Sequence, residues 1–123
     1  KKNIKNLLMD QTFVSGLGNI YVNEVLFKCK IYPLKSCINL DKKNIQDLVF
    51  NIKKTLKISI SKGGSSIKNF KNTLGKIGHF QELFNVYGRE NKKCKRSSCN
   101  GNIKRLKISN RACFYCEKCQ KLN

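Results

Sequence analysis

Four cysteines near the end of the chain have the spacing of a metal site. Cys94 and Cys99 are separated by four residues, Cys116 and Cys119 by two, and 16 residues lie between the two pairs. A zinc ion prefers four soft ligands at the corners of a tetrahedron, and each short turn between two cysteines supplies two thiolates at once. The spacing therefore predicts a four-thiolate site with Zn²⁺ as its cofactor.

Two alternatives to this ligand set remain open from the sequence. A disulfide framework would need a secreted, oxidising setting, and the first residues indicate no signal peptide because they already follow a helical pattern. Cys113 forms a second Cys-x-x-Cys pair with Cys116, although a site shared with Cys99 favours Cys119. Since seven cysteines are an odd number, we expect reduced thiols in a reducing cytosol. Two of them should be ordinary buried or partly buried thiols: Cys29 and Cys37.

The charge balance points to a polyanionic partner. The chain carries 26 Lys and Arg against 7 Asp and Glu, a net charge of +19. Such an excess is typical of proteins that bind nucleic acid, with an anionic membrane surface as the alternative. No segment reaches the roughly 18 uncharged apolar residues of a spanning helix. The length of 123 residues suits one domain or two small ones.

Segments with helical periodicity would position these groups. We expect the first helix over residues 1–10, where Lys1 and Lys5 share a face that either contacts one phosphate strand or is simply solvated. The second should cover about residues 19–29. The turn before it, Gly16-Leu17-Gly18, allows tight backbone geometry and presents N–H groups that suit a phosphate.

A third, longer helix should begin after Asp41, which would cap its N-terminus, and end at Gly63-Gly64. The loop of residues 63–70 is either a connector or a lid that closes over a ligand. His79 is the single histidine, and we expect it on the surface or in a hydrogen bond. The apolar residues of the helix recur at helical spacing and should lie in the core: Ile45, Leu48, Val49, Ile52, Leu56 and Ile60.

The last part of the chain is expected to form a small β-hairpin. Residues 80–88 carry apolar side chains that would dock it onto the helices. Residues 103–108 and 112–115 should be its strands, joined at 109–111. Arg111 would then lie at the tip, where a guanidinium can reach a phosphate or enter a groove.

Six stretches carry a distinctive order of glycines, aromatic residues and cysteines: 8–11 (LMDQ), 16–24 (GLGNIYVNE), 31–33 (IYP), 63–66 (GGSS), 85–90 (NVYGRE) and 111–120 (RACFYCEKCQ). They are spread over nearly the whole chain, and together they resemble the C-terminal half of the formamidopyrimidine-DNA glycosylase / endonuclease VIII family. The Gly-Gly-Ser-Ser loop is similar to that of the formamidopyrimidine branch.

The resemblance implies a mainly α fold. A helix-two-turns-helix DNA-binding domain would occupy residues 1–85, and a small β-hairpin zinc ribbon, a zinc finger, residues 86–123. In this family both parts grip duplex DNA around an extruded damaged base. The implied partner is duplex DNA with an oxidised or abasic site, bound by a monomer in a bacterial-type cytoplasm, at the nucleoid and without a membrane.

The resemblance also implies roles for individual residues. Asn19 matches the asparagine that binds phosphate beside the lesion, and Lys1 and Lys5 fall where the family has DNA-contacting lysines. Arg111 matches the zinc-finger arginine that clamps the damaged nucleotide's phosphates and acts in the final δ-elimination. The other matches are the loop that closes over the flipped base, with Ser65, Ser66 and Lys68, and the zinc ligands Cys94, Cys99, Cys116 and Cys119.

The chain departs from the family's pattern in its cysteines and at its start. The first cysteine pair is two residues wider than usual, and Cys113 stands where threonine is common. The family's chemistry starts from an N-terminal proline amine that attacks the sugar, whereas this chain begins Lys1-Lys2 and its one proline, Pro33, is internal. We therefore expect the chain alone to be inactive and to have a separate N-terminal catalytic half as a partner.

Three functions follow as hypotheses. The favoured one is the damaged-DNA-binding C-terminal part of a base-excision-repair DNA glycosylase / AP lyase for oxidised purines. The second is a stand-alone, zinc-dependent DNA-binding protein without catalysis. The third is a zinc-ribbon interaction protein of the translation or transcription machinery, which the helix-two-turns-helix match disfavours.

Overall fold

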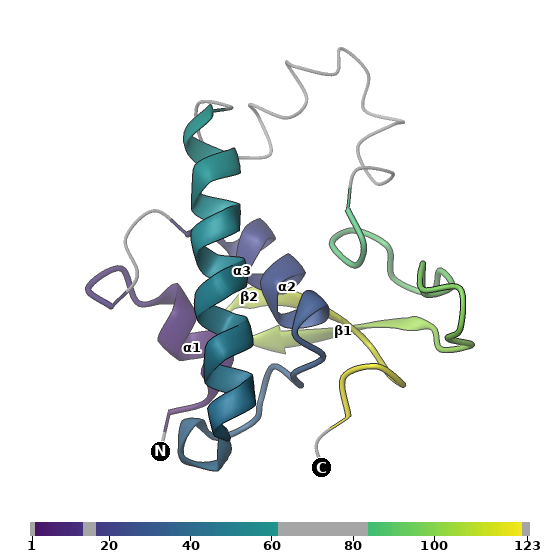
Figure 1. Ribbon diagram of the computed structural model, residues 1–123. Helices are drawn as coiled ribbons and strands as arrows, with labels where there is room; N and C mark the ends of the chain where they lie inside the picture. The colour runs from purple at the N-terminus through teal and green to yellow at the C-terminus, as the bar shows by residue number, and fades with distance from the viewer. Residues whose placement is uncertain (1, 14–16, 62–83, 122–123) are drawn as a thin grey trace.

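The computed structural model describes residues 2–13, 17–61 and 84–121. Within them, three α-helices precede one two-stranded antiparallel sheet, so the expected helical part followed by a hairpin is confirmed (Figure 1). No helix in these ranges is long and apolar enough to cross a membrane. In chain order the elements are α1 (Ile4–Met9), α2 (Asn19–Lys28), the short 3-10 helix η1 (Cys37–Asn39), α3 (Lys42–Ser61), β1 (Ile103–Ile108) and β2 (Arg111–Cys116).

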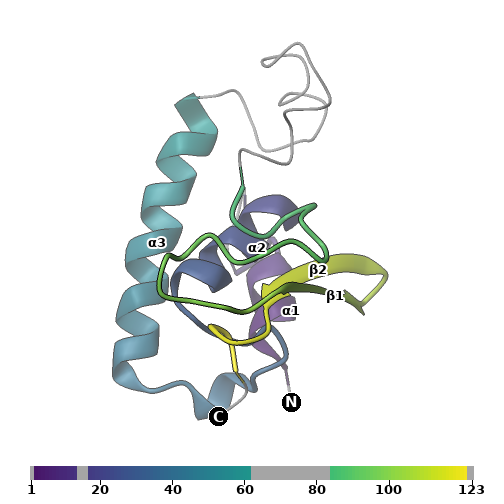
Figure 2. The same cartoon turned by 90° about the vertical axis from the view of Figure 1, so that its right-hand side faces the viewer.

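Helix α2 lies at the centre of the molecule. Figure 2 shows it between α3 on one side and the hairpin on the other, and it also contacts α1. Residues 20–27 are all buried, as expected for a helix that packs on several sides. The helix starts at the N-cap Gly18 and ends before Lys30, whose φ of 59° turns the chain away. The expected span of 19–29 is confirmed.

Helix α1 is shorter than the expected 1–10. The Asn3 side chain caps it by accepting a hydrogen bond from the Asn6 amide at 2.8 Å. The expectation of an outward Lys5 is wrong, because this side chain is only 1% exposed. The hairpin turn contacts α1 beside Lys5: the Ser109 hydroxyl donates to the Asn6 side-chain oxygen at 3.2 Å.

Helix α3 begins as expected, since the Asn44 amide donates to the Asp41 carboxylate at 2.7 Å. The prediction that its whole apolar stripe is core is wrong. Leu48 is buried, but Ile45 and Val49 are 50% and 46% exposed. These two line an apolar groove of about 450 Å³ that separates α3 from α1, so only one edge of the stripe reaches the core.

The hairpin has the shortest possible connection. Ile108 pairs with Arg111, and the two residues between them, Ser109 and Asn110, have φ of 50° and 66°. Two successive left-handed residues form the type I′ turn whose twist matches that of the paired strands. Arg111 is therefore the first residue of β2 rather than part of the connection at 109–111, although it is exposed beside the turn.

Several predictions concern residues outside the described ranges. They are Lys1 as a DNA contact, the turn glycine Gly16, the glycine pair Gly63-Gly64 at the end of the third helix, the loop residues Ser65, Ser66 and Lys68, and His79.

Candidate metal centre and nucleic-acid interface

The four cysteines with metal-site spacing converge. The sulfur of Cys94 lies 3.7 Å from that of Cys119, and Cys99 lies 3.6 Å from Cys116 and 3.4 Å from Cys119. All four sulfurs lie within 4.8 Å of one another. A tetrahedron with metal–sulfur bonds of about 2.3 Å has sulfur–sulfur edges of roughly 3.8 Å. The four thiols could hold a metal ion with little rearrangement.

Backbone amides point at the sulfurs. The Gly101 amide donates to Cys99 at 3.3 Å, and the Cys119 amide donates to Cys116 at 3.4 Å. The Gly101 amide is the main cause that lowers the pKa of Cys99, to about 7, whereas burial raises the pKa of Cys94 to about 12. Amide donors of this kind stabilise a thiolate, the form that binds metals.

Gly101 is required by close packing against this cluster. A Cβ atom at this position would lie 2.9 Å from the Cys116 sulfur and 3.0 Å from the Cβ of Lys118. Distances this short force the neighbours to move. The turn from Cys94 to Cys99, the first knuckle, has four intervening residues. The chain after it can pack this closely against Cys116 and Lys118 because residue 101 has no side chain.

The structure also decides between the alternative cysteine assignments. Cys113 is buried in β2 and does not belong to the group of four, and burial raises its pKa to about 11. All seven cysteines lie in the described ranges and are free thiols there, so the structure has no disulfide framework in those ranges. As expected, Cys29 is buried and Cys37 partly buried.

Asn19 lies where α2 meets the hairpin. Its side-chain amide donates to the Ala112 carbonyl at 3.1 Å, one residue after the exposed Arg111. Asn19 is also the first residue of α2, and the N-cap Gly18 offers no side chain to the first amides of the helix. A helix N-terminus with free amides attracts anions. Asn19 and Arg111 are thus neighbours at a positively polarised surface.

Lys5 lies next to this surface, beneath it rather than on it. Its amine is buried and has no hydrogen-bond partner in the described part of the chain. Burial is the main cause that lowers the pKa of Lys5, and Arg111 and Cys113 are close enough to act on it electrostatically, with opposite signs. The structure therefore brings Lys5, Asn19 and Arg111 together, but only Arg111 is fully exposed.

We expect Lys5→Met to stabilise the fold at neutral pH. The folded state penalises the ammonium, since the folded pKa lies below the ordinary 10.5. Replacing a buried charge by an apolar side chain of similar length should gain about 1–3 kcal/mol in unfolding free energy. The difference from the parent should shrink as the pH rises through the lowered folded pKa of Lys5, and it should be smallest above 10.5, where the amine is neutral in both states.

Urea unfolding of both proteins at several pH values measures this difference. Lys54→Met on the exposed side of α3 is the matched control and should change stability by less than about 0.5 kcal/mol. A loss of stability in Lys5→Met at pH 7 would mean that the buried amine contributes a favourable interaction.

Three polar residues that the sequence analysis assigned no role hold the hairpin region against the helices. The Glu24 carboxylate accepts the backbone amides of residues 85, 86 and 87 at 2.8, 3.0 and 3.0 Å. The Asn23 side-chain oxygen accepts the Phe114 amide at 2.7 Å, and the Gln120 side chain donates to the Ile31 carbonyl at 3.0 Å. The sequence did carry a signal for two of these residues: Asn23 and Glu24 are polar and stand inside the apolar segment 20–27. Buried polar side chains need hydrogen-bond partners, so a role in holding another segment could have been expected.

A family profile described as "Formamidopyrimidine-DNA glycosylase H2TH domain" matches residues 1–71. The formamidopyrimidine-DNA glycosylase of Roseobacter denitrificans is 46% identical over 118 residues, which are 96% of this chain and 42% of that protein. The one from Lactobacillus delbrueckii subsp. bulgaricus is 44% identical over 119 residues. The chain thus spans about two fifths of the length of these curated relatives.

Solved structures agree with this match. MutM in complex with DNA that contains carbocyclic 8-oxo-G has a TM-score of 0.79 at 41% identity, over 98% of this chain and 42% of that one. The Lactococcus lactis formamidopyrimidine-DNA glycosylase, bound non-covalently to DNA with an AP site, has a TM-score of 0.78 at 39% identity, with the same coverage. Sequence, fold and cysteine cluster agree: the chain belongs to the formamidopyrimidine-DNA glycosylase family and matches the C-terminal part of its members.

Proposed function

We propose that this chain is the damaged-DNA-binding C-terminal part of a base-excision-repair DNA glycosylase / AP lyase for oxidised purines. The observation that carries the proposal is the meeting of Asn19 and Arg111 at the N-terminus of α2, above the buried cation of Lys5. Related proteins of the same fold were solved with 8-oxo-G or AP-site DNA. A duplex carries closely spaced phosphates, which the net charge of +19 complements.

Each of the three residues has a physical role in this proposal. Arg111 is exposed and offers a planar fork of donors, which suits two oxygens of one phosphate. Asn19 and the first amides of α2 supply neutral donors to the neighbouring phosphate. Lys5 adds positive potential from below without a direct contact, which revises the expected DNA-contacting role. Lys1, Ser65, Ser66 and Lys68 remain proposed contacts by family resemblance.

We also propose that the cysteine cluster binds Zn²⁺ as a structural site. Cys94, Cys99, Cys116 and Cys119 would supply four thiolates and leave no open position, as in closed structural sites. The ion would hold both knuckles and thereby the hairpin that carries Arg111. This supports a division into a helical domain, residues 1–85, and a zinc finger, residues 86–123.

Excision chemistry is proposed to need more than this chain. The curated relatives are more than twice as long as the segment matched here. We propose that a catalytic N-terminal part supplies the nucleophile, and that the present residues grip the duplex. Arg111 would act in δ-elimination only when that part is present.

Arg111→Ala tests the DNA-binding proposal. Removing the charged contact should weaken binding to a duplex with an abasic site by about 1–3 kcal/mol and reduce the slope of log affinity against log salt by about one. Fluorescence anisotropy at several salt concentrations measures both quantities on the 123-residue chain.

The matched control is Lys54→Ala, which removes the same charge from the exposed side of α3. Figure 2 shows that α3 and the hairpin lie on opposite sides of α2, so this control should bind DNA like the parent. Equal affinities for the parent and Arg111→Ala would remove Arg111 from the DNA interface. An equal loss in both variants would mean that only net charge matters.

A further inference from the structure

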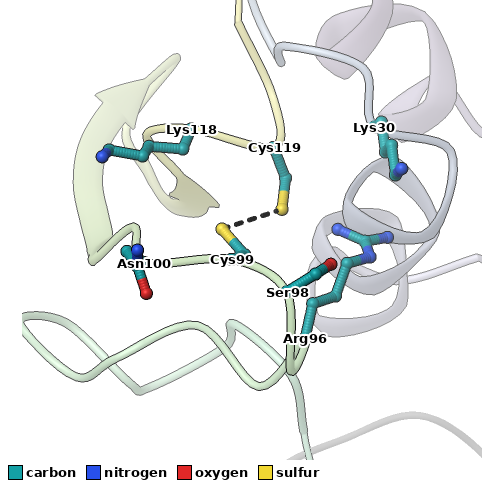
Figure 3. Close-up of a pocket in the computed structure, with 7 residues that line it drawn as sticks. All are labelled: Lys30, Arg96, Ser98, Cys99, Asn100, Lys118 and Cys119. Atoms are coloured by element: carbon teal, nitrogen blue, oxygen red, sulfur yellow. Dashed lines mark hydrogen bonds between the residues drawn. The ribbon is translucent and has the colours of Figure 1, made fainter.

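Arg96, in the wide first knuckle, contacts two parts of the molecule at once. It lies between Cys94 and Cys99, the pair with four intervening residues. Figure 3 shows its side chain extending from the knuckle, beside Cys99 and Cys119, towards the segment that carries Lys30. Neither the family resemblance nor the proposed function gives this residue a role.

The first contact is with the C-terminal end of α2. The Arg96 Nη2 donates to the Phe27 carbonyl at 2.8 Å, and the guanidinium carbon lies 4.0 Å from the centre of the Phe27 ring. The carbonyls of a last helical turn lack intrahelical donors and form the negative end of the helix dipole. Arg96, 69 positions away in the sequence, thus adds a side-chain donor to a carbonyl at the end of α2 that also accepts the Lys30 amide at 3.1 Å.

The second contact is with the cysteine cluster. Arg96 lines the same pocket as Cys99 and Cys119, so its side chain lies beside two of the clustered cysteines (Figure 3). The Arg96 Nη1 is buried and has no hydrogen-bond partner among the residues that the structure describes. Four thiolates around a divalent ion carry a net charge of about −2. A sulfur of the metal-loaded site is therefore the acceptor that suits this guanidinium.

The surrounding pocket supports this assignment. It has a volume of about 430 Å³ and is lined by Lys30, Lys118, Arg96 and two of the cysteines, together with two polar residues. The net charge of about −2 on a metal-loaded site would offset most of these three positive charges. Of these cationic side chains, only that of Arg96 donates a hydrogen bond to α2 within the described ranges.

We propose that Arg96 is a positioning residue that couples zinc occupancy of the four-cysteine site to the C-terminal end of α2. With zinc bound, the guanidinium would contact a sulfur of the cluster on one side, and the Phe27 carbonyl and ring on the other. Helix α2 carries Asn19 at its other end, so the coupling would also hold the hairpin at the proposed DNA surface. That last consequence rests on the proposed function, whereas the coupling itself does not.

A double-mutant cycle on the rate of zinc release tests the coupling. Arg96→Gln should release zinc to a chromogenic chelator about tenfold faster, the lower end of the effect of residues that support metal ligands. Phe27→Leu removes the ring that the guanidinium covers and should also speed release. In the double variant the two effects should not multiply, because both break one linkage, and such coupling is reciprocal.

Lys118→Gln is the matched control, since it removes a cation from the same pocket whose side chain donates no hydrogen bond to α2 within the described ranges. Its effect and that of Phe27→Leu should multiply in the double variant. Arg96→Lys keeps the charge but lacks the fork, and it should behave as Arg96→Gln in the cycle. This second variant keeps the test valid if Arg96→Gln does not fold.

Hydrogen exchange of the zinc-loaded chain gives an independent readout. The amides of Lys30 and Ile31 donate to the Phe27 and Leu26 carbonyls and report on the end of α2. They should exchange about tenfold faster in Arg96→Gln and at the parental rate in Lys118→Gln. Two results would overturn the proposal. One is that the effects of Arg96→Gln and Phe27→Leu on the rate of zinc release multiply in the double variant. The other is that the Lys30 and Ile31 amides of Arg96→Gln exchange at the parental rate. Neither measurement uses DNA, so the coupling and the proposed function can fail separately.

Discussion

Removal of zinc from the 123-residue chain is expected to unfold the zinc finger while the helices persist. The hairpin of β1 and β2 is too small to be stable alone, since an isolated two-stranded hairpin is at best marginal in water. A structural zinc ion supplies about 10–16 kcal/mol in small folds of this kind. The remaining core of this region consists of few residues, among them Phe27, Val86 and Ile103.

The measurement is an amide spectrum before and after a chelator. Amides of the paired strands, such as those of residues 104–107, should lose their dispersed shifts and their protection. The far-ultraviolet signal of α2 and α3 should largely remain, because these helices share a separate core cluster with α1. Adding one equivalent of Zn²⁺ should restore the spectrum.

Cysteine variants supply the matched control for this experiment. Cys116→Ser should abolish zinc binding, whereas Cys37→Ser should leave one zinc ion per chain, because Cys37 lies outside the cluster. If a chelator leaves the strands protected, the zinc assignment is wrong. If Cys37→Ser also loses the ion, the ligand set is wrong.

The features that the sequence predicted well depend on local pattern. The four clustered cysteines could be found because metal geometry restricts their spacing, and β2 lies close to the expected strand at 112–115. Helix α2 and the Asp41 cap follow from residue types at fixed offsets. These signals are contained within a few residues, so no knowledge of packing was needed.

The errors arise where packing between distant segments decides. Lys5 was expected at the surface, but it is buried, and Arg111 and Cys113 of β2, about a hundred residues later, lie close enough to act on its amine. The Ile45 edge of α3 was expected in the core, but it borders an open groove. A periodic pattern shows which residues share a face and not which neighbour covers that face, so neither outcome was available from the sequence.

We expect Glu24→Ala to be among the most destabilising single substitutions in the chain. The Glu24 carboxylate is 7% exposed and accepts three consecutive backbone amides, at residues 85–87. Hydrogen bonds to a charged acceptor are worth about 1.5–3 kcal/mol each, and buried donors left without a partner cost more than the bond itself. We expect a loss of about 3–5 kcal/mol, a large part of the stability of a small domain.

Glu24→Gln separates the effect of charge from that of shape. The glutamine keeps one acceptor oxygen but turns its NH₂ group towards a backbone N–H, so we expect an intermediate loss of about 1–3 kcal/mol. Glu90→Gln is the matched control, because Glu90 is exposed and should tolerate the same change. Urea unfolding of the zinc-loaded proteins measures the unfolding free energies of Glu24→Ala, Glu24→Gln and Glu90→Gln against that of the parent.

The place where Glu24→Ala loosens the structure shows whether Glu24 docks one segment or stabilises the whole fold. The three amides connect α2 to the segment that leads into the zinc finger, where Val86 is fully buried. Glu24→Ala should therefore increase exchange of the amides of residues 85–87 more than that of the α1 amides. Stability equal to that of the parent would mean that water replaces the carboxylate at no cost. Apolar packing of Phe84, Val86 and Tyr87 would then hold the segment.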